Sequence, residues 1–335
     1  MNIYILNATI NGKIFLEVLL KKIQIKGIIT LDNNGKKKTN EYYDYTKYCE
    51  DNKLECIKVS SYYLNEEKDR KIIEKHDIDL ILVASWQRLI PDWLIEKCTI
   101  GVIGAHGSHD GIEKGRGRSP QNWALIAGKN RFSLSIFWIM SGVDNGNIID
   151  TIEFEYLPTD TILVSYIKVS LYKAKMIIDN IENGRIARKE GTPQNKEGLF
   201  LPKRIKEDGL IDWNRDAINI SNMIRALTKP YPGAYTKING KEYCIWSARP
   251  VVVENIFYSE FKNGTILSIL DESILVKCGN NLLLIDEIDN IDNLKEGDIF
   301  ESSNYRIQIE NIINRHMESY GTPLSSLVYD ELEST

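Results

Sequence analysis

The chain of 335 residues has few cysteines, and their spacing does not build a site. The five cysteines are widely scattered, and no two of them form a Cys-x-x-Cys pair. This spacing argues against a disulfide framework and against a thiolate zinc site. Each cysteine is therefore interpreted as a small buried apolar residue and not as a nucleophile.

Long hydrophobic runs are also missing. The longest apolar stretches, such as residues 80–84 and 102–105, are far too short to cross a bilayer. The first residues lack the basic region and the apolar stretch of a signal peptide, and they indicate a strand. Because 43% of the residues are hydrophobic and 27% are charged, the chain can bury ordinary cores. We therefore expect a cytoplasmic protein without a membrane partner, long enough for two domains.

Two nucleotide-binding motifs are absent as well. The turn after the first expected strand, at residues 7–12, lacks the three-glycine fingerprint of a dinucleotide fold. No Walker lysine motif occurs elsewhere in the sequence. The sequence therefore supports neither NAD nor ATP as a ligand.

Positive charge is scarce in the C-terminal part. Residues 211–335 carry 11 Lys and Arg against 19 Asp and Glu, a balance of −8. Since the whole chain has a net charge of −5, residues 1–210 carry +3. An acidic C-terminal part is a poor surface for a polyanion such as a nucleic acid.

Strand-like and helical segments alternate through the first hundred residues. Compact runs rich in Ile and Val predict strands at residues 3–6, 27–31, 56–59, 80–84 and 101–105. Helical spacing between them predicts an α/β fold with a mainly parallel twisted sheet and helices on both faces. Ligands bind beyond the carboxyl ends of such strands, so we expect a site at the loops after Ala84 and Ala105.

The rest of the chain predicts a second domain. The pattern indicates strands at residues 131–139 and 148–154, a long helix at 161–183 and a loop at 191–195. A helix at 217–227 then precedes short strands that continue to about residue 313, which is typical of a small barrel-like domain. We expect a catalytic domain over residues 1–205, a β-rich, OB-like domain over 206–318 and a tail over 319–335.

His106 and Asp144 are the candidates for chemistry. His106 follows an expected strand, and Asp144 lies in a glycine-flanked turn thirty-eight residues later. The two side chains can meet at the carboxyl edge of the sheet. The carboxylate would then fix the imidazole tautomer and stabilise its charged form. A structural histidine is the alternative that these two residues alone leave open.

The ordered motifs around this pair resemble the formyltransferase family that uses N10-formyltetrahydrofolate. The family shows Asn-x-His at a strand end, Leu-Pro-x-x-Arg-Gly-x-x-Pro-x-x-Trp-Ala after it, and a Leu/Val-Asp-x-Gly-x-Ile turn. The matching residues here are His106, Arg116-Gly117, Pro120, Trp123-Ala124 and Val143-Asp144-Asn145-Gly146-Asn147-Ile148. Residues 202–213 and 224–235 resemble the hinge and the opening of the family's C-terminal domain.

The resemblance implies transfer of a formyl group from N10-formyltetrahydrofolate to a primary amine, with His106 and Asp144 catalytic. Protonated His106 would donate a hydrogen bond to the oxyanion, and Asp144 would hold the ring. The residues expected to bind the donor are Trp86, Arg88, Leu89, Ile90, Ile139, Gly142 and Val143. The residues expected to contact the acceptor are Gly104, Ser108, Arg116 and Arg118. For the two arginines, a structural ion pair is the equal alternative.

Two departures from the family pattern lie beside His106. Gly104 stands where the family has Asn, so an oxyanion contact worth ~3 kcal/mol is lost or replaced. The following loop is two residues longer and has His109 and Asp110 in place of Leu-Pro. This loop either replaces the lost amide or is only variable. A zinc hydrolase site that includes His106 is a further hypothesis, but the family pattern explains His106 without a metal.

The acceptor is predicted from the motifs and the charge. Arg-Gly-Arg-Ser-Pro-x-Asn-Trp-Ala-Leu-Ile and Pro-Tyr-Pro-Gly-Ala-Tyr are closer to the sugar enzymes of the family, which formylate nucleotide-linked amino deoxy sugars for surface polysaccharide. We therefore expect such a sugar as partner, and a homodimer, since related sugar enzymes are often dimers. Methionyl-tRNA is the alternative, disfavoured by the acidic C-terminal part. A non-catalytic relative that binds folate or an amino sugar is a third hypothesis, which Gly104 allows; loss of His106 or Asp144 would favour it, and both are present.

Overall fold

The computed structural model describes residues 1–33, 41–195, 197–253 and 258–333. They divide into two compact units, each made of separate stretches of the chain. Unit 1 comprises Met1–Arg116, Ser133–Phe154 and Tyr166–Gly198, and unit 2 comprises Gly117–Phe132, Glu155–Ser165 and Leu199–Thr335. Unit 2 thus includes residues 117–132 and 155–165, which the expected division at residue 205 assigns to the first domain.

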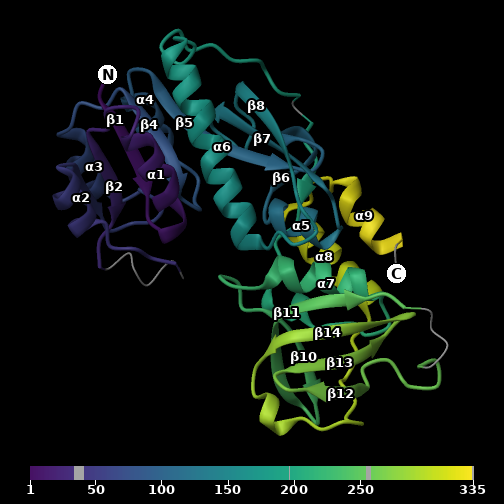
Figure 1. The fold of residues 1–335 in the computed structure, drawn as a ribbon. Coiled ribbons are helices and arrows are strands. Elements are labelled where there is room, and N and C mark those ends of the chain that lie inside the picture. Colours follow the sequence, from purple (N-terminus) through teal and green to yellow (C-terminus); the bar gives the residue numbers. More distant parts are fainter. Residues whose placement is uncertain (34–40, 196, 254–257, 334–335) are drawn as a thin grey trace. The chain divides into compact units, whose positions relative to one another are not determined.

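Unit 1 is built on a seven-stranded sheet of order β3-β2-β1-β4-β5-β7-β8 (Figure 1). Its strands are β1 (Ile3–Asn7), β2 (Gly27–Leu31), β3 (Glu55–Val59), β4 (Leu80–Ser85), β5 (Gly101–Ser108), β7 (Arg131–Trp138) and β8 (Ile148–Glu155). The first five strands pair in parallel, whereas β7 runs antiparallel to β5. The predicted α/β fold with a mainly parallel sheet is therefore confirmed.

Helices cover both faces of this sheet. They are α1 (Lys13–Leu20), α2 (Thr46–Asn52), α3 (Glu67–Glu74), α4 (Asp92–Lys97) and α6 (Ile162–Glu182). On one face, Tyr4 and Leu6 of β1 share a buried cluster with Ile73 of α3 and Leu94 of α4. Alternation along β1 directs Ile5 to the other face, and there it is fully buried. Among the described residues, no helix is long and apolar enough to cross a membrane.

Helix α6 carries a lysine into the interior of unit 1. Lys173 is only 6% exposed, and its Nζ donates to the carbonyl oxygen of Ala84 at 2.7 Å. The same Nζ lies 4.0 Å from the centre of the Phe15 ring. Burial lowers the pKa of this amine to about 7. Lys173 therefore ties α6 to the carboxyl end of β4, just before the loop expected to bind the donor.

We expect Lys173 to make stability depend on pH. Its pKa is about 7 in the folded chain and near 10.5 in the unfolded chain, so between these values the unfolded state binds more protons. The free energy of unfolding of the wild type, relative to Lys173→Met, should rise by about 1 kcal/mol per pH unit between pH 7 and pH 9. Urea unfolding at several pH values measures this difference. The exposed Lys22→Met is the control, and parallel curves for Lys173→Met and wild type would contradict the prediction.

Unit 2 contains a five-stranded antiparallel sheet of order β10-β11-β14-β13-β12. Its strands are β10 (Ala234–Ile238), β11 (Lys241–Val251), β12 (Ile266–Leu270), β13 (Ser273–Cys278) and β14 (Asn281–Ile288). The segment at residues 299–301 bridges both edges, because Ile299 pairs with Thr265 and Glu301 pairs with Lys237. This segment gives the sheet the barrel-like closure that the sequence predicts.

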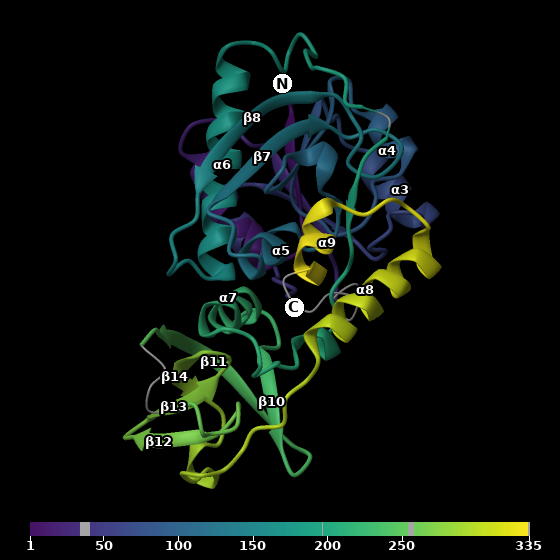
Figure 2. The same ribbon diagram turned by 90° about the vertical axis from the view of Figure 1, so that its right-hand side faces the viewer.

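Helices, which are labelled in Figure 2, and a short two-stranded sheet complete unit 2. They are α5 (Pro120–Ile126), α7 (Ala217–Leu227), α8 (Tyr305–Tyr320) and α9 (Ser326–Glu333), with β6 (Arg116–Gly117) paired to β9 (Phe200–Leu201). The expectation of strands up to residue 313 is wrong from residue 305 on, because α8 begins there. Ile309 and Ile312 are buried at helical spacing, and the Asn304 side chain caps the helix by accepting from the Ile307 N–H at 3.1 Å. The expected tail also contains α9, whose Val328 is fully buried.

Candidate active site

His106 lies inside strand β5 and not in the loop after it. The strand continues past its expected end at Ala105 to Ser108, because β7 pairs with this extension and places Ser135 opposite His106. The imidazole is 11% exposed. Pairing on the β7 side therefore fixes the backbone of the candidate catalytic residue on a sheet strand.

Each nitrogen of the His106 ring faces an acceptor. Nδ1 lies 3.4 Å from Oδ2 of Asp144, and Nε2 lies 2.7 Å from the carbonyl oxygen of Gly115. The structure thus contains the contact with Asp144 that the sequence predicts. Which of the two nitrogens donates depends on the tautomer of the ring. Donation from Nε2 to a substrate oxygen requires exchange of the bond to Gly115.

Asp144 is held in a tight turn with unusual backbone angles. Its φ is 48°, and Gly142 in the same turn has φ 114°. The side-chain amide of Gln194 donates to the carbonyl oxygens of Asp144 at 3.0 Å and of Gly146 at 2.6 Å. Nothing in the sequence indicates this role of Gln194, because a glutamine after a proline in an expected loop carries no periodic signal.

Three of the residues predicted to contact the acceptor have partners within the protein. Arg116 is 3% exposed and donates to Oε1 of Gln194 at 3.0 Å. The buried Ser108 hydroxyl donates to the carbonyl oxygen of Gly111 at 2.7 Å and so closes its own loop. Arg118 is exposed and belongs to unit 2, where its backbone N–H donates to Leu201 at 3.0 Å. For Arg116, the geometry therefore favours the structural alternative.

A side chain at Gly104 would have to displace the Ile139 side chain. A Cβ atom added to Gly104 would lie 2.7 Å from Cδ1 of Ile139 and 3.5 Å from the Phe137 ring. The Ile139 side chain therefore occupies the space beside β5 that a side chain at position 104 would enter.

The two stretches expected to bind the donor meet at one buried cluster of unit 1. Trp86 and Ile90 belong to the cluster that also contains Tyr62, and Ile139 packs against it. Trp86 is 8% exposed, and its indole N–H has no acceptor among the described residues. A buried N–H without a partner costs about 1–3 kcal/mol, so it is suited to a ligand acceptor.

The remaining residues of these stretches are more open. Arg88 lies with its guanidinium carbon 4.7 Å from the centre of the Tyr62 ring. Leu89 is 63% exposed and Val143 is 39% exposed. Exposed apolar side chains beside a buried unpaired donor are the surroundings that a flat heteroaromatic ring prefers. These residues therefore fit a folate ring, although their role in binding stays a prediction.

A metal site is not evident in the described part of the chain. Nε2 of His109 lies 3.6 Å from Oδ1 of Asp110, its sequence neighbour. No group of three His, Cys, Asp or Glu side chains in the residues that the structure describes is placed to hold a metal ion.

Comparison with known proteins identifies the family. The family model described as formyl transferase matches residues 18–181, and the model for the formyl transferase C-terminal domain matches residues 203–297. The methionyl-tRNA formyltransferase of Koribacter versatilis is 32% identical over 224 residues, which cover 66% of this chain and 68% of that protein. The chain belongs to the formyltransferase family. It is therefore an enzyme that transfers formyl groups, and the formyl donor of the family is N10-formyltetrahydrofolate.

Other relatives and solved structures agree with this assignment. The methionyl-tRNA formyltransferase of Syntrophus aciditrophicus is 28% identical over 258 residues, 76% of each chain. HypX from Aquifex aeolicus, solved with tetrahydrofolic acid, has a TM-score of 0.60 at 17% identity. The match covers 97% of this chain but only 58% of HypX. An N-formyltransferase from Helicobacter canadensis, solved with folinic acid and dTDP-3-aminofucose, has a TM-score of 0.57 at 18% identity. This match covers 85% of this chain and 98% of the Helicobacter chain. At these identities the structures support the fold alone.

We predict that His106→Asn lowers kcat by at least about 100-fold, because it removes the imidazole that lies beside the Asp144 carboxylate. The measurement is the rate of tetrahydrofolate release in the presence of an acceptor. His76→Asn serves as the control, since His76 contacts Glu55 on another strand of the sheet. Full activity of His106→Asn would contradict the role assigned to this residue.

We also predict that Gly104→Asn destabilises the protein by about 1–3 kcal/mol, because its Cβ would overlap Ile139. Adding Ile139→Ala should recover part of this loss, since it removes the Cδ1 atom that the new side chain meets. Urea unfolding of the two single variants and the double variant measures the coupling. If the changes in the free energy of unfolding of the two single variants simply add up in the double variant, Ile139 does not restrict position 104.

Proposed function

We propose that this formyltransferase acts on the methionyl group of aminoacylated tRNA. The observation that carries the proposal is the set of relatives, in which methionyl-tRNA formyltransferases match up to 76% of this chain. The C-terminal domain of the family is matched as well, at residues 203–297. The acceptor expected from the sequence motifs was a nucleotide-linked amino sugar, and these relatives move the preference to its alternative.

The site supplies the chemistry that formylation of an amine needs. A primary amine attacks only when it is neutral, so the reaction needs a group that takes up its proton near neutral pH. Asp144 can accept that proton through water, and its Oδ2 lies 3.4 Å from Nδ1 of His106. Once Nε2 exchanges Gly115 for the substrate, His106 donates a hydrogen bond to an oxygen that gains negative charge. The unpaired Trp86 N–H and the exposed Leu89 fit the folate donor.

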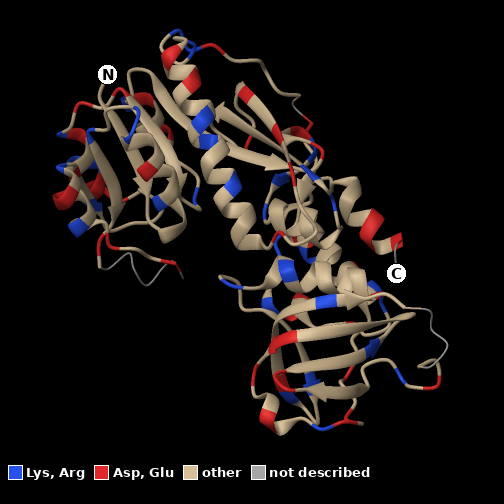
Figure 3. Cartoon of the chain, in the orientation of Figure 1, with Lys and Arg blue, Asp and Glu red and all other residues tan. Residues whose placement is uncertain are grey.

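A nucleotide-linked amino sugar remains the second candidate, because several exposed basic side chains of unit 2 are paired with carboxylates. Among exposed pairs, Lys206 meets Glu242 at 2.6 Å, Lys229 meets Glu287 at 2.8 Å and Arg249 meets Asp286 at 2.5 Å. Figure 3 shows basic and acidic residues mixed over the C-terminal strands in that view. A phosphate backbone is bound by unpaired Lys and Arg side chains, so these pairs weaken the tRNA proposal.

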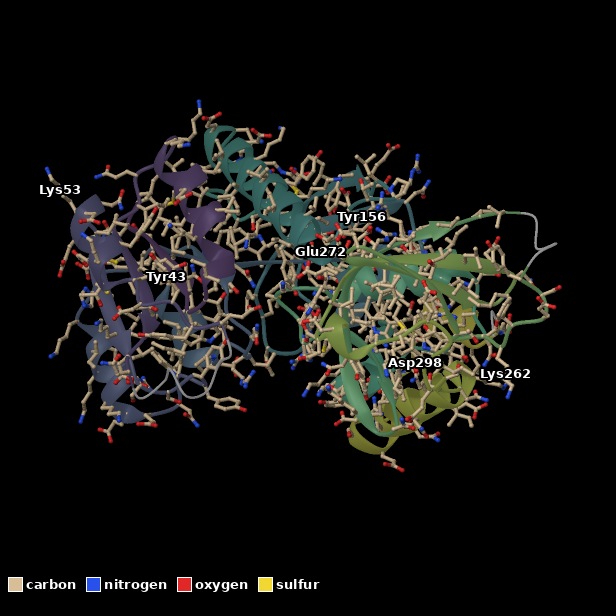
Figure 4. All side chains as sticks on the ribbon, turned by 60° about the horizontal axis from the view of Figure 1, so that its bottom comes forward. Tyr43, Lys53, Tyr156, Lys262, Glu272 and Asp298 are labelled. Carbon is tan, nitrogen blue, oxygen red and sulfur yellow. The ribbon has the colours of Figure 1, made fainter. Side chains whose placement is uncertain are left out.

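Unit 2 nevertheless has cations that could meet phosphates. Residues 203–297 carry 12 Lys and Arg against 14 Asp and Glu, so most of the acidic excess after residue 210 lies beyond the matched domain. Lys203 is exposed, and Figure 4 shows the Lys262 side chain projecting away from the ribbon. The acidic excess of residues 211–335 is therefore weaker evidence against tRNA than the total suggests.

A comparison of the two kinds of acceptor tests the proposal. The protein is incubated with N10-formyltetrahydrofolate and either methionyl initiator tRNA or a panel of nucleotide-linked amino deoxy sugars, and mass spectrometry detects the formylated product. We expect formylmethionyl-tRNA, with a rate that falls steeply between about 50 and 200 mM salt, because phosphate contacts release counterions. His106→Asn is the control for background transfer.

Two other outcomes would contradict the proposal and favour another function. A formylated sugar together with unchanged tRNA would assign the sugar as acceptor. Donor binding without transfer to either acceptor would favour the binding-protein hypothesis.

A further inference from the structure

We propose that Gln194 and Arg116 are positioning residues that hold the two partners of His106 on either side of its ring. One partner is the Asp144 carboxylate at Nδ1, and the other is the Gly115 carbonyl at Nε2. These partners come from two different loops of unit 1. The proposal rests on formyl transfer by His106 and Asp144 and does not depend on which acceptor the enzyme uses.

Gln194 holds the loop of the first partner. Its Nε2 donates to the carbonyl oxygens of Asp144 and Gly146, at 3.0 Å and 2.6 Å. The segment before Gln194 is itself fixed, because Thr192 and Ile148 exchange backbone hydrogen bonds of 2.7 Å and 2.8 Å. One glutamine amide thus caps two carbonyls of the Asp144 turn from a segment anchored to β8.

Arg116 bonds the loop of the second partner, the Gly115 carbonyl, to Gln194. Its Nη2 donates to Oε1 of Gln194 at 3.0 Å and to the carbonyl oxygen of Asn195 at 2.7 Å. Since Arg116 directly follows Gly115, these bonds also fix the carbonyl that meets Nε2 of His106. A Cβ atom at Gly198 would lie 2.5 Å from the guanidinium carbon, so glycine there leaves room for the arginine.

A second tie joins the same two segments. The backbone N–H of Asn195 donates to Oε1 of Glu113 at 2.5 Å, and its side-chain amide donates to Oε2 at 3.3 Å. Glu113 lies two residues before Gly115. The segment at residues 194–195 therefore bonds to the loop that carries Gly115 on one side and to the Asp144 turn on the other.

The Asp144 turn needs such support. The φ of Asp144 is 48°, and a left-handed backbone at a residue other than glycine persists where its surroundings hold it in place. A displacement of about 1 Å at a reacting group can lower a rate by about 100-fold. Loss of the Gln194 amide should therefore lower kcat through the position of Asp144.

A double-mutant cycle between Gln194 and Asp144 tests this inference. We expect Gln194→Leu to lower kcat by about 10- to 100-fold. In an Asp144→Asn background, Gln194→Leu should lower kcat by less than about threefold, because the carboxylate that Gln194 positions is already gone. Gln194→Glu keeps the acceptor for Arg116 but cannot donate to the two carbonyls, so it should be at least as impaired as Gln194→Leu.

Gln308→Leu is the matched control, because Gln308 also donates to a backbone carbonyl, that of Leu210 at 2.8 Å, but lies in unit 2. It should leave kcat unchanged even if it lowers the melting temperature. Equal losses from Gln194→Leu in both backgrounds, or a loss confined to KM, would overturn the proposal.

A spectroscopic readout does not require an acceptor. In protein labelled with ¹⁵N-histidine, the ring signals of His106 are assigned by their absence in His106→Asn. Gln194→Leu should shift them in the same direction as Asp144→Asn, and Gln308→Leu should leave them in place. Unshifted signals in Gln194→Leu would contradict the inference. A wrong choice of acceptor would instead appear as missing turnover by the wild type with tRNA, so the two failures are distinguishable.

Discussion

The antiparallel pairing of β7 with β5 is the constraint on which the candidate site depends. It continues β5 beyond the parallel part of the sheet and sets Ser135 opposite His106. At the end of β7, the N–H of Trp138 donates to the carbonyl oxygen of Asn147 at 3.0 Å, so the segment between them is a closed loop that contains Asp144. A slip of one residue in this pairing would turn His106 to the other face of the sheet. The strand register therefore brings the imidazole and the carboxylate together.

Most hydrogen bonds that complete the site involve backbone carbonyls. Gly115 supplies one to the imidazole, and Asp144 and Gly146 supply two to Gln194. Backbone groups at these places are set by the path of the loops and not by side-chain type. Substitution of the loop residues can therefore leave the bonds in place, whereas a change in loop length moves them.

The sequence predicts the regular elements of unit 1 well, because its strands are compact runs of Ile and Val separated by helical spacing. It also predicts the contact of His106 with Asp144, since both follow the family motif. The helix α8 was not predicted, because its isoleucines at 307, 309, 312 and 313 resemble a strand when their helical spacing is not considered. The roles of Arg116 and Gln194 were not predictable either. Whether a buried arginine meets a substrate or a glutamine depends on a contact across 78 residues of chain.

The contact between Gly104 and Ile139 couples two positions that lie far apart in the sequence. A side chain at position 104 would have to displace Cδ1 of Ile139, and a smaller residue at position 139 alone would leave a void beside β5. The residue that the fold accepts at position 104 therefore depends on the side chain at position 139.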